Sequence, residues 1–232
     1  MQRTNVRQVA KAGAALATYH RIMARSPQGM GRREQSFPER FQERLDIFCE
    51  NVASLNGLLS NLGIEASLDY FTDTLSEIEK SILRLPYENL PRLIIHGDYR
   101  RQNILFHGER IAAVMDFHRS RSEARSLDLA IALADIVPRV ENGHGANLAR
   151  NFVTGYGRVG SLSEDEVEAL PALVEARVAW RVFRRVRRIV KARDNTKRLR
   201  GARRLRMYVA HLRRVRMIQS SWKRVFEGAT GE

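Results

Sequence analysis

The chain has 232 residues, of which 44% are hydrophobic and 28% charged, so it can bury one large core or two smaller ones. Its net charge is +14, which excludes a chain that is acidic overall. A single cysteine excludes an internal disulfide framework, and no apolar run approaches the ~18 residues of a membrane span. The N-terminus also lacks the apolar core of a signal peptide, so the sequence predicts a cytoplasmic protein.

Apolar residues spaced three and four apart predict helices over most of the first 90 residues. One helix is expected over Val6 to Met23. An apolar stripe from Phe41 to Leu59, ended by Gly63, and a second stripe from Leu68 to Leu85 predict two amphipathic helices packed antiparallel. Cys49 is expected to be a buried structural thiol on the first of these helices.

Two capping boxes, in which a Ser and a Glu three residues later cap the same turn, mark helix starts. They are Ser36 with Glu39 and Ser163 with Glu166. Pro171 is expected to interrupt or kink the helix that follows the second box, because proline removes a backbone donor.

The most informative stretch is Leu93 to Phe117, LIIHGDYRRQNILFHGERIAAVMDF. Its short apolar runs, with a Gly-bearing turn between the last two, predict a strand, a loop and a hairpin. Asp98, Asn103 and Asp116 stand where these runs end. Polar residues at strand ends are held by a rigid scaffold yet reach solvent, so catalytic groups collect there.

The spacing of these polar residues favours phosphoryl transfer. Asp98 and Asn103 are five apart, as in the kinase catalytic loop, where the Asp accepts the substrate proton and the Asn holds magnesium. Asp116, followed by Phe117, stands where the metal-binding Asp of such enzymes follows a hairpin. Each residue alone is more simply a turn former or a cap. Together with His96-Gly97 they favour the kinase interpretation.

The motifs HGDYRRQNILF, IAAVMDF and SLDLAIAL resemble the aminoglycoside phosphotransferase family, which includes choline kinase and type II homoserine kinase relatives. The resemblance implies a protein-kinase-like fold, with ATP as phosphoryl donor and Mg²⁺ as cofactor. It also implies that Asp98 is the catalytic base and that Asn103 and Asp116 bind the metal and the nucleotide. His96 and Asp128 would support the loop.

The family's N-terminal lobe covers the nucleotide phosphates and carries a strand Lys paired to a helix Glu. Residues 1–5, which precede the first expected helix, contain neither. The chain is therefore expected to be a C-terminal, large lobe, mainly α with one small β-hairpin. Leading helices would occupy 1–90, the catalytic loop, metal-binding hairpin and following helix 91–135, and C-terminal helices 136–232.

Three explanations for the missing lobe compete: a truncation, a degraded kinase gene, or a genuine partial protein with another role. Supply of the small lobe by another chain is a separate possibility for a partner. Truncation is favoured. On this interpretation the chain is a small-molecule kinase that is weak or inactive alone.

The residues beside the expected site are basic. Arg100 and Arg101 lie in the loop, and His118 and Arg119 follow Asp116. If they face the substrate cleft, charge complementarity favours a neutral or anionic substrate over a polycationic aminoglycoside. The segment 118–125, HRSRSEAR, has no clear period.

Basic residues gather towards the C-terminus. From Ala172 to Phe226 there are 19 Lys and Arg against two acids, on helices expected to break at Asp194-Asn195. A solvated basic face is the simplest interpretation, with nonspecific polyanion binding as the sharper one. The alternative function is therefore a non-catalytic scaffold that uses these helices on an anionic partner.

Overall fold

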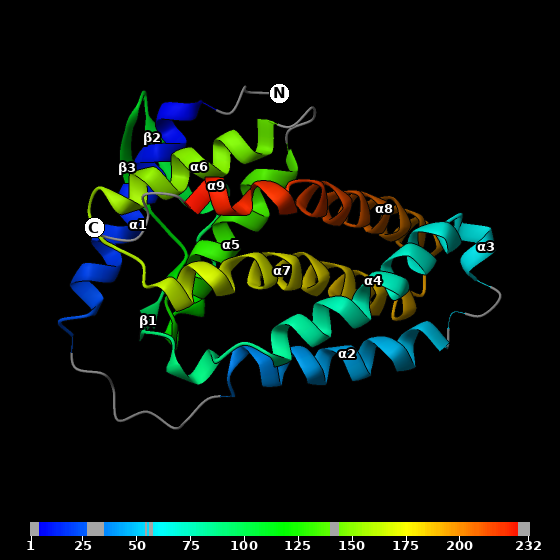
Figure 1. The fold of residues 1–232 in the computed structure, drawn as a ribbon. Helices are drawn as coiled ribbons and strands as arrows, with labels where there is room; N and C mark the ends of the chain where they lie inside the picture. The colour runs from blue at the N-terminus through cyan, green and yellow to red at the C-terminus, as the bar shows by residue number, and fades with distance from the viewer. Residues whose placement is uncertain (1–4, 27–34, 54, 56–57, 140–143, 227–232) are drawn as a thin grey trace. The chain divides into compact units, whose positions relative to one another are not determined.

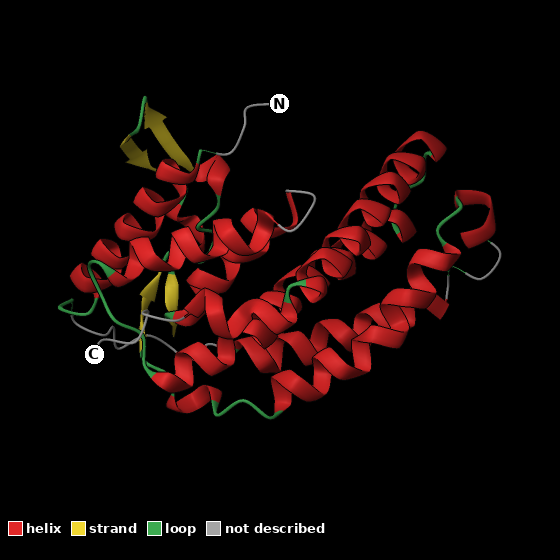
Figure 2. Cartoon of the chain, turned by 45° about the horizontal axis from the view of Figure 1, so that its top comes forward, coloured by secondary structure: helices red, strands yellow, loops and turns green. Residues whose placement is uncertain are grey.

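The computed structural model describes residues 5–26, 35–53, 55, 58–139 and 144–226. Helices dominate this part of the chain, and its strands form two small antiparallel pairs (Figures 1 and 2). The chain divides into two compact units that interleave along the sequence, unit 1 with residues 1–34, 86–174 and 214–232, and unit 2 with residues 35–85 and 175–213. Over the described ranges, no helix is both long and apolar enough to cross a membrane.

Unit 1 is built around a close crossing of two helices. Its elements include α1 (Val6–Met23), α5 (Ser126–Ile136), α6 (His144–Gly157), α9 (Trp222–Phe226), the start of α7 (Glu164–Val190) and the end of α8 (Asn195–Met217). A Cβ on Gly13 of α1 would lie 2.0 Å from the Phe152 carbonyl oxygen, and one on Gly155 of α6 would lie 1.9 Å from that of Ala10. Only glycine at these positions lets the two backbones touch.

The strands of unit 1 flank the loop that carries Asp98 and Asn103. β1 (Arg92–Ile95) pairs antiparallel with β4 (Arg121–Ala124), and β2 (Ile104–His107) pairs with β3 (Arg110–Val114). Short 3₁₀ turns lie between the longer elements, at Tyr87–Asn89 (η1), Arg101–Asn103 (η2), Phe117–Arg119 (η3), Val137–Arg139 (η4) and Gln219–Ser221 (η5). The expected hairpin is confirmed as β2–β3. The expected strand before the loop is confirmed as β1, whereas its partner β4 was not predicted, because β4 is a polar strand whose pairing with β1 leaves no apolar alternation in the sequence.

Unit 2 is helical and has an aromatic core. It contains α2 (Phe37–Ala53), α3 (Leu59–Leu62), α4 (Glu65–Leu83), the end of α7 and most of α8. The Phe183 ring of α7 lies 5.3 Å from Phe41, 5.1 Å from Phe48 and 5.8 Å from Phe71, measured between ring centroids. Such ring contacts join the apolar faces of three helices.

Several sequence predictions are confirmed. α1 spans the expected residues, and α7 and α8 are separated at Asp194, whose side chain accepts from the Thr196 N–H at 2.8 Å. In both capping boxes the glutamate accepts from the serine backbone N–H, from Ser36 at 2.6 Å and from Ser163 at 2.9 Å.

Two expectations were wrong, and a third was wrong in one of its two alternatives, the interruption of a helix at Pro171. The first apolar stripe is not one helix, because α2 ends at Ala53 and α3 begins only at Leu59. Cys49 is exposed, since it lies one position beyond Phe48 and thus off the apolar face of α2. Pro171 lies inside α7, which continues through it. The loss of one backbone donor there is outweighed by a helix whose apolar face is buried over many turns.

Candidate active site

The loop after β1 is held by the carboxylate of Asp128 on α5. Oδ2 of Asp128 accepts from the His96 N–H at 2.7 Å, and Oδ1 accepts from the Gly97 N–H at 2.8 Å. The residue is fully buried, so both hydrogen bonds are sheltered from water. A carboxylate that binds two successive amides fixes the direction in which the chain leaves β1.

The Asp128 carboxylate is held in turn by a histidine of α1. His20 Nε2 lies 3.2 Å from Asp128 Oδ2, and its Nδ1 lies 2.9 Å from the Tyr156 hydroxyl. Because a carboxylate only accepts, Nε2 carries the proton and Nδ1 accepts from Tyr156 in the neutral ring. Sequence reasoning missed this role. The available signal was a polar side chain on the apolar face of α1.

Gly97 is required by its backbone. Its φ is +75°, and a Cβ there would lie 2.2 Å from the Arg119 carbonyl oxygen. The left-handed conformation and the close approach of the η3 turn both exclude a side chain. The chain thus turns sharply between β1 and Asp98.

His96 links the loop to the end of the hairpin. Its Nδ1 accepts from the Asp98 N–H at 3.2 Å, so its Nε2 carries the proton and donates to the Met115 carbonyl at 3.0 Å. The Met115 N–H donates to the Asn103 carbonyl at 2.8 Å. Met115 directly precedes Asp116. These two hydrogen bonds therefore hold the backbone before Asp116 against both His96 and Asn103.

Asp98 and Asn103 are in direct contact. The Asn103 amide donates from Nδ2 to the Asp98 carbonyl at 2.8 Å and approaches Asp98 Oδ2 at 3.4 Å. Arg100 Nη2 donates to the same Oδ2 at 2.6 Å. Asp98 is 4% exposed, and no donor in the described part of the chain reaches its Oδ1. Oδ1 of Asp98 can therefore accept a hydrogen bond or a proton from a ligand.

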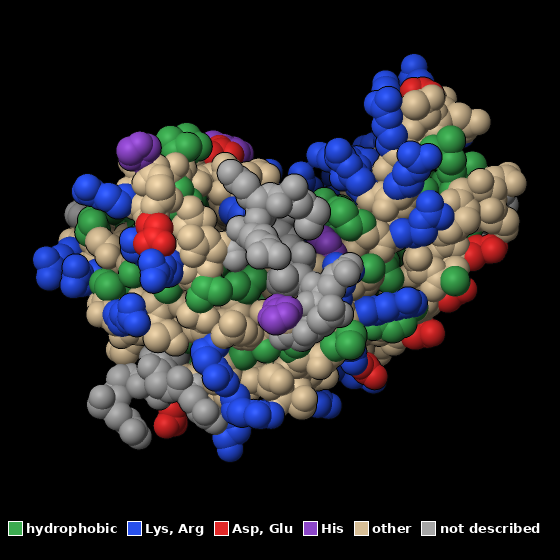
Figure 3. All heavy atoms as spheres, turned by 90° about the horizontal axis from the view of Figure 1, so that it is seen from above, with side chains coloured by type: hydrophobic (Ala, Val, Ile, Leu, Met, Phe, Trp, Pro, Cys, Tyr) green, Lys and Arg blue, Asp and Glu red, His purple; other side chains and the backbone are tan. Residues whose placement is uncertain are grey.

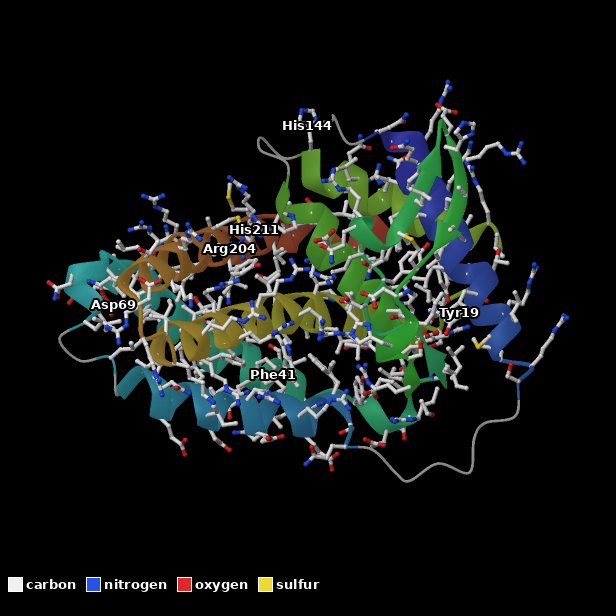
Figure 4. The ribbon with its side chains drawn as sticks, turned by 180° about the vertical axis from the view of Figure 1, so that it is seen from behind. Tyr19, Phe41, Asp69, His144, Arg204 and His211 are labelled. Carbon is white, nitrogen blue, oxygen red and sulfur yellow. The ribbon has the colours of Figure 1, made fainter. Side chains whose placement is uncertain are left out.

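Asp116 follows the β2–β3 hairpin, and its side chain contacts a residue outside the Asp98 cluster. It adopts a left-handed backbone with φ of +71°, and its Oδ1 contacts His118 Nδ1. Arg119 Nε lies 3.3 Å from His118 Nε2. The next residue, Phe117, packs on the His96 ring with 4.6 Å between centroids and on Tyr19 of α1 at 5.8 Å. The position of Tyr19 is labelled in Figure 4. The Asp116 carboxylate is exposed, so it is open to a ligand from solvent.

The donor atoms present fit a magnesium ion. Because Asn103 uses its amide nitrogen on the Asp98 carbonyl, its Oδ1 is left as an oxygen donor, and Asp116 adds a carboxylate. Mg²⁺ prefers such hard oxygen ligands and takes the rest from water and phosphate. No group of three or more His, Cys, Asp or Glu side chains suited to a metal occurs among the described residues, so nucleotide oxygens would have to complete the site.

A cavity of about 470 Å³ lies against the same loop within unit 1. Arg100 and Arg101 line it, together with Tyr99, Leu105 of β2 and Gln8 of α1. His118 and Arg119 are not among its described lining residues. The four basic residues expected to share one cleft thus divide into a pair at the cavity and a pair at Asp116.

Known proteins resemble this chain in fold and in part of its sequence. It superposes on an aminoglycoside phosphotransferase from Alicyclobacillus acidocaldarius with a TM-score of 0.67 at 18% identity, over 96% of this chain and 67% of that one. It superposes on an amicoumacin kinase, solved in complex with AMP-PNP, Ca²⁺ and Ami, with a TM-score of 0.61 at 14% identity, over 91% of this chain and 60% of that one. These likenesses define a kinase-like fold.

The sequence comparisons identify the family. Residues 2–170 match the phosphotransferase enzyme family, and the chain belongs to it. It is 35% identical over 85 residues to a homoserine kinase from Bradyrhizobium diazoefficiens, an alignment that covers 37% of this chain and 26% of that relative. The matched region is therefore about a quarter of that relative's length.

Proposed function

We propose that this chain carries the catalytic base and metal ligands of a small-molecule kinase, which transfers the γ-phosphoryl group of ATP to a substrate hydroxyl. The contact of Asp98 with Asn103 and Arg100, in a loop braced by Asp128, is the observation that carries the proposal. Family membership and the names of the kinase relatives agree with it.

Asp98 would act through its Oδ1. The substrate hydroxyl would give its proton to this oxygen as its own oxygen bonds to the γ-phosphorus and the bond to the ADP oxygen breaks. Oδ2 already accepts from Arg100 and Asn103, so these two residues orient the carboxylate. Positioning of this kind supplies much of the rate in phosphoryl transfer, which needs little covalent chemistry from the protein.

Asn103 and Asp116 would hold Mg²⁺. When bound, the ion would neutralise negative charge on the nucleotide phosphates. The residues themselves have separate tasks, since Asn103 also fixes the Asp98 main chain and Asp116 stays exposed. His118, in contact with Asp116, would have to release that carboxylate when the nucleotide binds.

We further propose that the segment covering the nucleotide phosphates lies outside residues 1–232, in the same polypeptide or in another chain. The sequence has no Gly-rich strand–turn–strand and no strand lysine of the kinase type, and the alignment to the homoserine kinase covers 26% of that protein. The chain would then correspond to a large lobe. Its cavity of about 470 Å³ would take the small-molecule side of the reaction or part of the nucleotide.

The charge at the cavity suggests the substrate class. Arg100 and Arg101 line it. Arg100 is paired with Asp98, so the guanidinium of Arg101 is the charge that would repel a polycation. A neutral or anionic hydroxyl compound, such as an amino-acid alcohol, therefore fits better than an aminoglycoside. The homoserine kinase relatives agree with this charge preference, because homoserine carries a carboxylate.

The first experiment is Mg²⁺-dependent ATP binding by calorimetry on the wild-type chain and on Asp116→Ala. Binding that the substitution abolishes would support a nucleotide site in these residues. Turnover is then screened with a hydroxyl amino acid, an amino alcohol and an aminoglycoside, with a longer polypeptide if the chain alone is inactive. Asp98→Asn should lower kcat by roughly 10²–10⁴-fold, the usual contribution of a positioned base.

A matched pair of variants tests the substrate class. Arg101→Ala, at the lining cation that does not touch Asp98, should weaken an anionic substrate strongly, whereas Arg110→Ala, at an exposed position on β3, should leave kcat/KM unchanged. Phosphorylation of aminoglycosides alone would refute the proposed substrate class. Absence of any phosphoryl transfer in the complete protein would favour the scaffold alternative.

A further inference from the structure

Unit 2 contains a second, larger cavity that the proposed phosphoryl transfer does not use. Its volume is about 880 Å³, and it is lined by the C-terminal half of α7, the N-terminal half of α8 and part of α2. Ten of its fifteen described lining residues are Arg or Lys, and none of the fifteen is acidic. Lys and Arg side chains crowd the surface on the side of α8 in Figure 3. The lining of this cavity is therefore strongly positive.

The basic side chains converge because the two helices repeat them at helical spacing. Arg184 and Arg188 of α7 and Lys191, directly after its end, follow one another at intervals of four and three residues, and Lys197, Arg200 and Arg204 of α8 at intervals of three and four. Such residues share one helix face. Val186 and Ile189, which lie between the α7 cations, are buried, so the charged rows are left on the cavity side.

Gly201 brings α8 close to α7. A Cβ at this position would lie 2.6 Å from Ile189 Cγ1, so glycine permits a tight contact between the helices directly beside the cavity. The opposing rows of cations are therefore held near each other by apolar packing. The apolar packing between the helices offsets the like-charge repulsion between the two rows.

Most of these cations lack a protein counter-charge. Arg187, Arg188, Lys191, Lys197, Arg203 and Arg204 form no ion pair with any carboxylate in the described part of the chain. Asp194, in the turn between the helices, uses its Oδ1 to cap α8. The nearest acid in sequence is thus already engaged with the backbone.

Arg185 shows the local excess of positive charge. Burial lowers the pKa of its guanidinium from the usual value, Tyr208 opposes this, and the charges of Arg188 and Arg204 lower it further. Its Nε is buried without a hydrogen-bond acceptor among the described residues. A buried donor that lacks an acceptor is costly unless a ligand supplies one.

We propose that this cavity binds a compact anion that carries three or more phosphate groups. Arginine dominates the lining, and its planar fork matches phosphate oxygens in pairs. The volume lies in the range of small-molecule sites, and its concave form suits a compact ligand better than a flat lipid surface. Several phosphate groups are needed because six lining cations have no ion pair with a carboxylate in the described part of the chain.

Inorganic tripolyphosphate is the probe. Calorimetry at physiological ionic strength, without Mg²⁺, should show one tripolyphosphate bound per chain. Arg188→Gln with Arg204→Gln should weaken it by roughly 100-fold, about tenfold for each charged hydrogen bond removed. The position of Arg204 on α8 is marked in Figure 4. Asp98→Asn should bind like the wild type, which separates this cavity from the proposed catalytic site.

The matched control is Arg150→Gln with Arg158→Gln, which removes the same charge from exposed positions of unit 1. It should bind tripolyphosphate as the wild type does, and circular dichroism should show both double variants folded. An equal loss in the control would overturn the proposal in favour of attraction by net charge. Failure of tripolyphosphate to bind, with retention of a short single-stranded oligonucleotide, would overturn it in favour of a nucleic-acid surface.

Discussion

Replacement of Asp128 by alanine should unfold unit 1 far more easily, because three buried donors would lose their acceptor. These are the backbone N–H groups of His96 and Gly97 and the Nε2–H of His20. A buried donor left unsatisfied costs roughly 1–3 kcal/mol, so the loss of three acceptor contacts should lower the free energy of unfolding by roughly 3–9 kcal/mol. For a chain of this size that corresponds to a decrease of roughly 6–36 °C in Tm.

The assay is urea unfolding followed by tryptophan fluorescence. The chain has two tryptophans, Trp180 in unit 2 and Trp222 in unit 1. A Trp180→Phe background leaves Trp222, which is buried against Phe226, as a reporter of unit 1. The control is Glu168→Ala, an exposed carboxylate on the unit 1 part of α7, which should change stability by no more than about 0.5 kcal/mol.

A double-mutant cycle isolates the histidine. His20→Ala should be destabilising in the wild-type chain and clearly less so in Asp128→Ala, because their shared hydrogen bond is already gone. A loss below about 1 kcal/mol for Asp128→Ala would refute the reasoning. It would mean that water or other groups satisfy the three donors and that Asp128 does not brace the loop.

Three further predictions concern other positions. Gly97→Ala should destabilise unit 1 more than Gly108→Ala in the same urea assay, since both have positive φ but only the Cβ at Gly97 would strike the backbone; equal losses would leave φ as the sole cause. Gly201→Ala should cost roughly 1–3 kcal/mol by overpacking, and Ile189→Ala should recover part of that loss in the double variant; strict additivity would contradict the contact. Burial raises the pKa of the Tyr99 hydroxyl above its usual value near 10, and the neutral hydroxyl donates a hydrogen bond to the Ala12 carbonyl at 2.8 Å. The contribution of Tyr99 to the stability of the fold is therefore complete below pH 10 and is lost as pH rises above that. Tyr99→Phe should therefore lose about 1 kcal/mol at neutral pH and show a flatter decline in stability above pH 10; an unchanged alkaline decline would rule out this tyrosine.

The elements that could be predicted from sequence are those governed by local rules. α1, α4 and the hairpin follow from apolar spacing and turn chemistry, both of which act over a few residues. Likewise, the spacing of Asp98 and Asn103 placed both in one loop, because only four residues separate them. The resemblance to the phosphotransferase family rested on the same short stretch.

Long-range pairing was decided by the tertiary structure. β4 has no apolar alternation, so only its position beside β1 makes it a strand. Exposure of Cys49 depends on which face of α2 meets its neighbours. Neither outcome is encoded in a local period.

The site shows the same division. The candidate base and metal ligands stand in one segment of 19 residues, Asp98 to Asp116, and were recognisable there. The role of His20 depends on α5 bringing Asp128 to α1 from more than 100 residues away. Similarly, the basic helices were evident from composition, whereas their arrangement around one cavity required the packing of α7 against α8 at Gly201. Sequence determines which groups are available, and tertiary packing decides which of them share a buried environment in which electrostatic and hydrogen-bond energies become large.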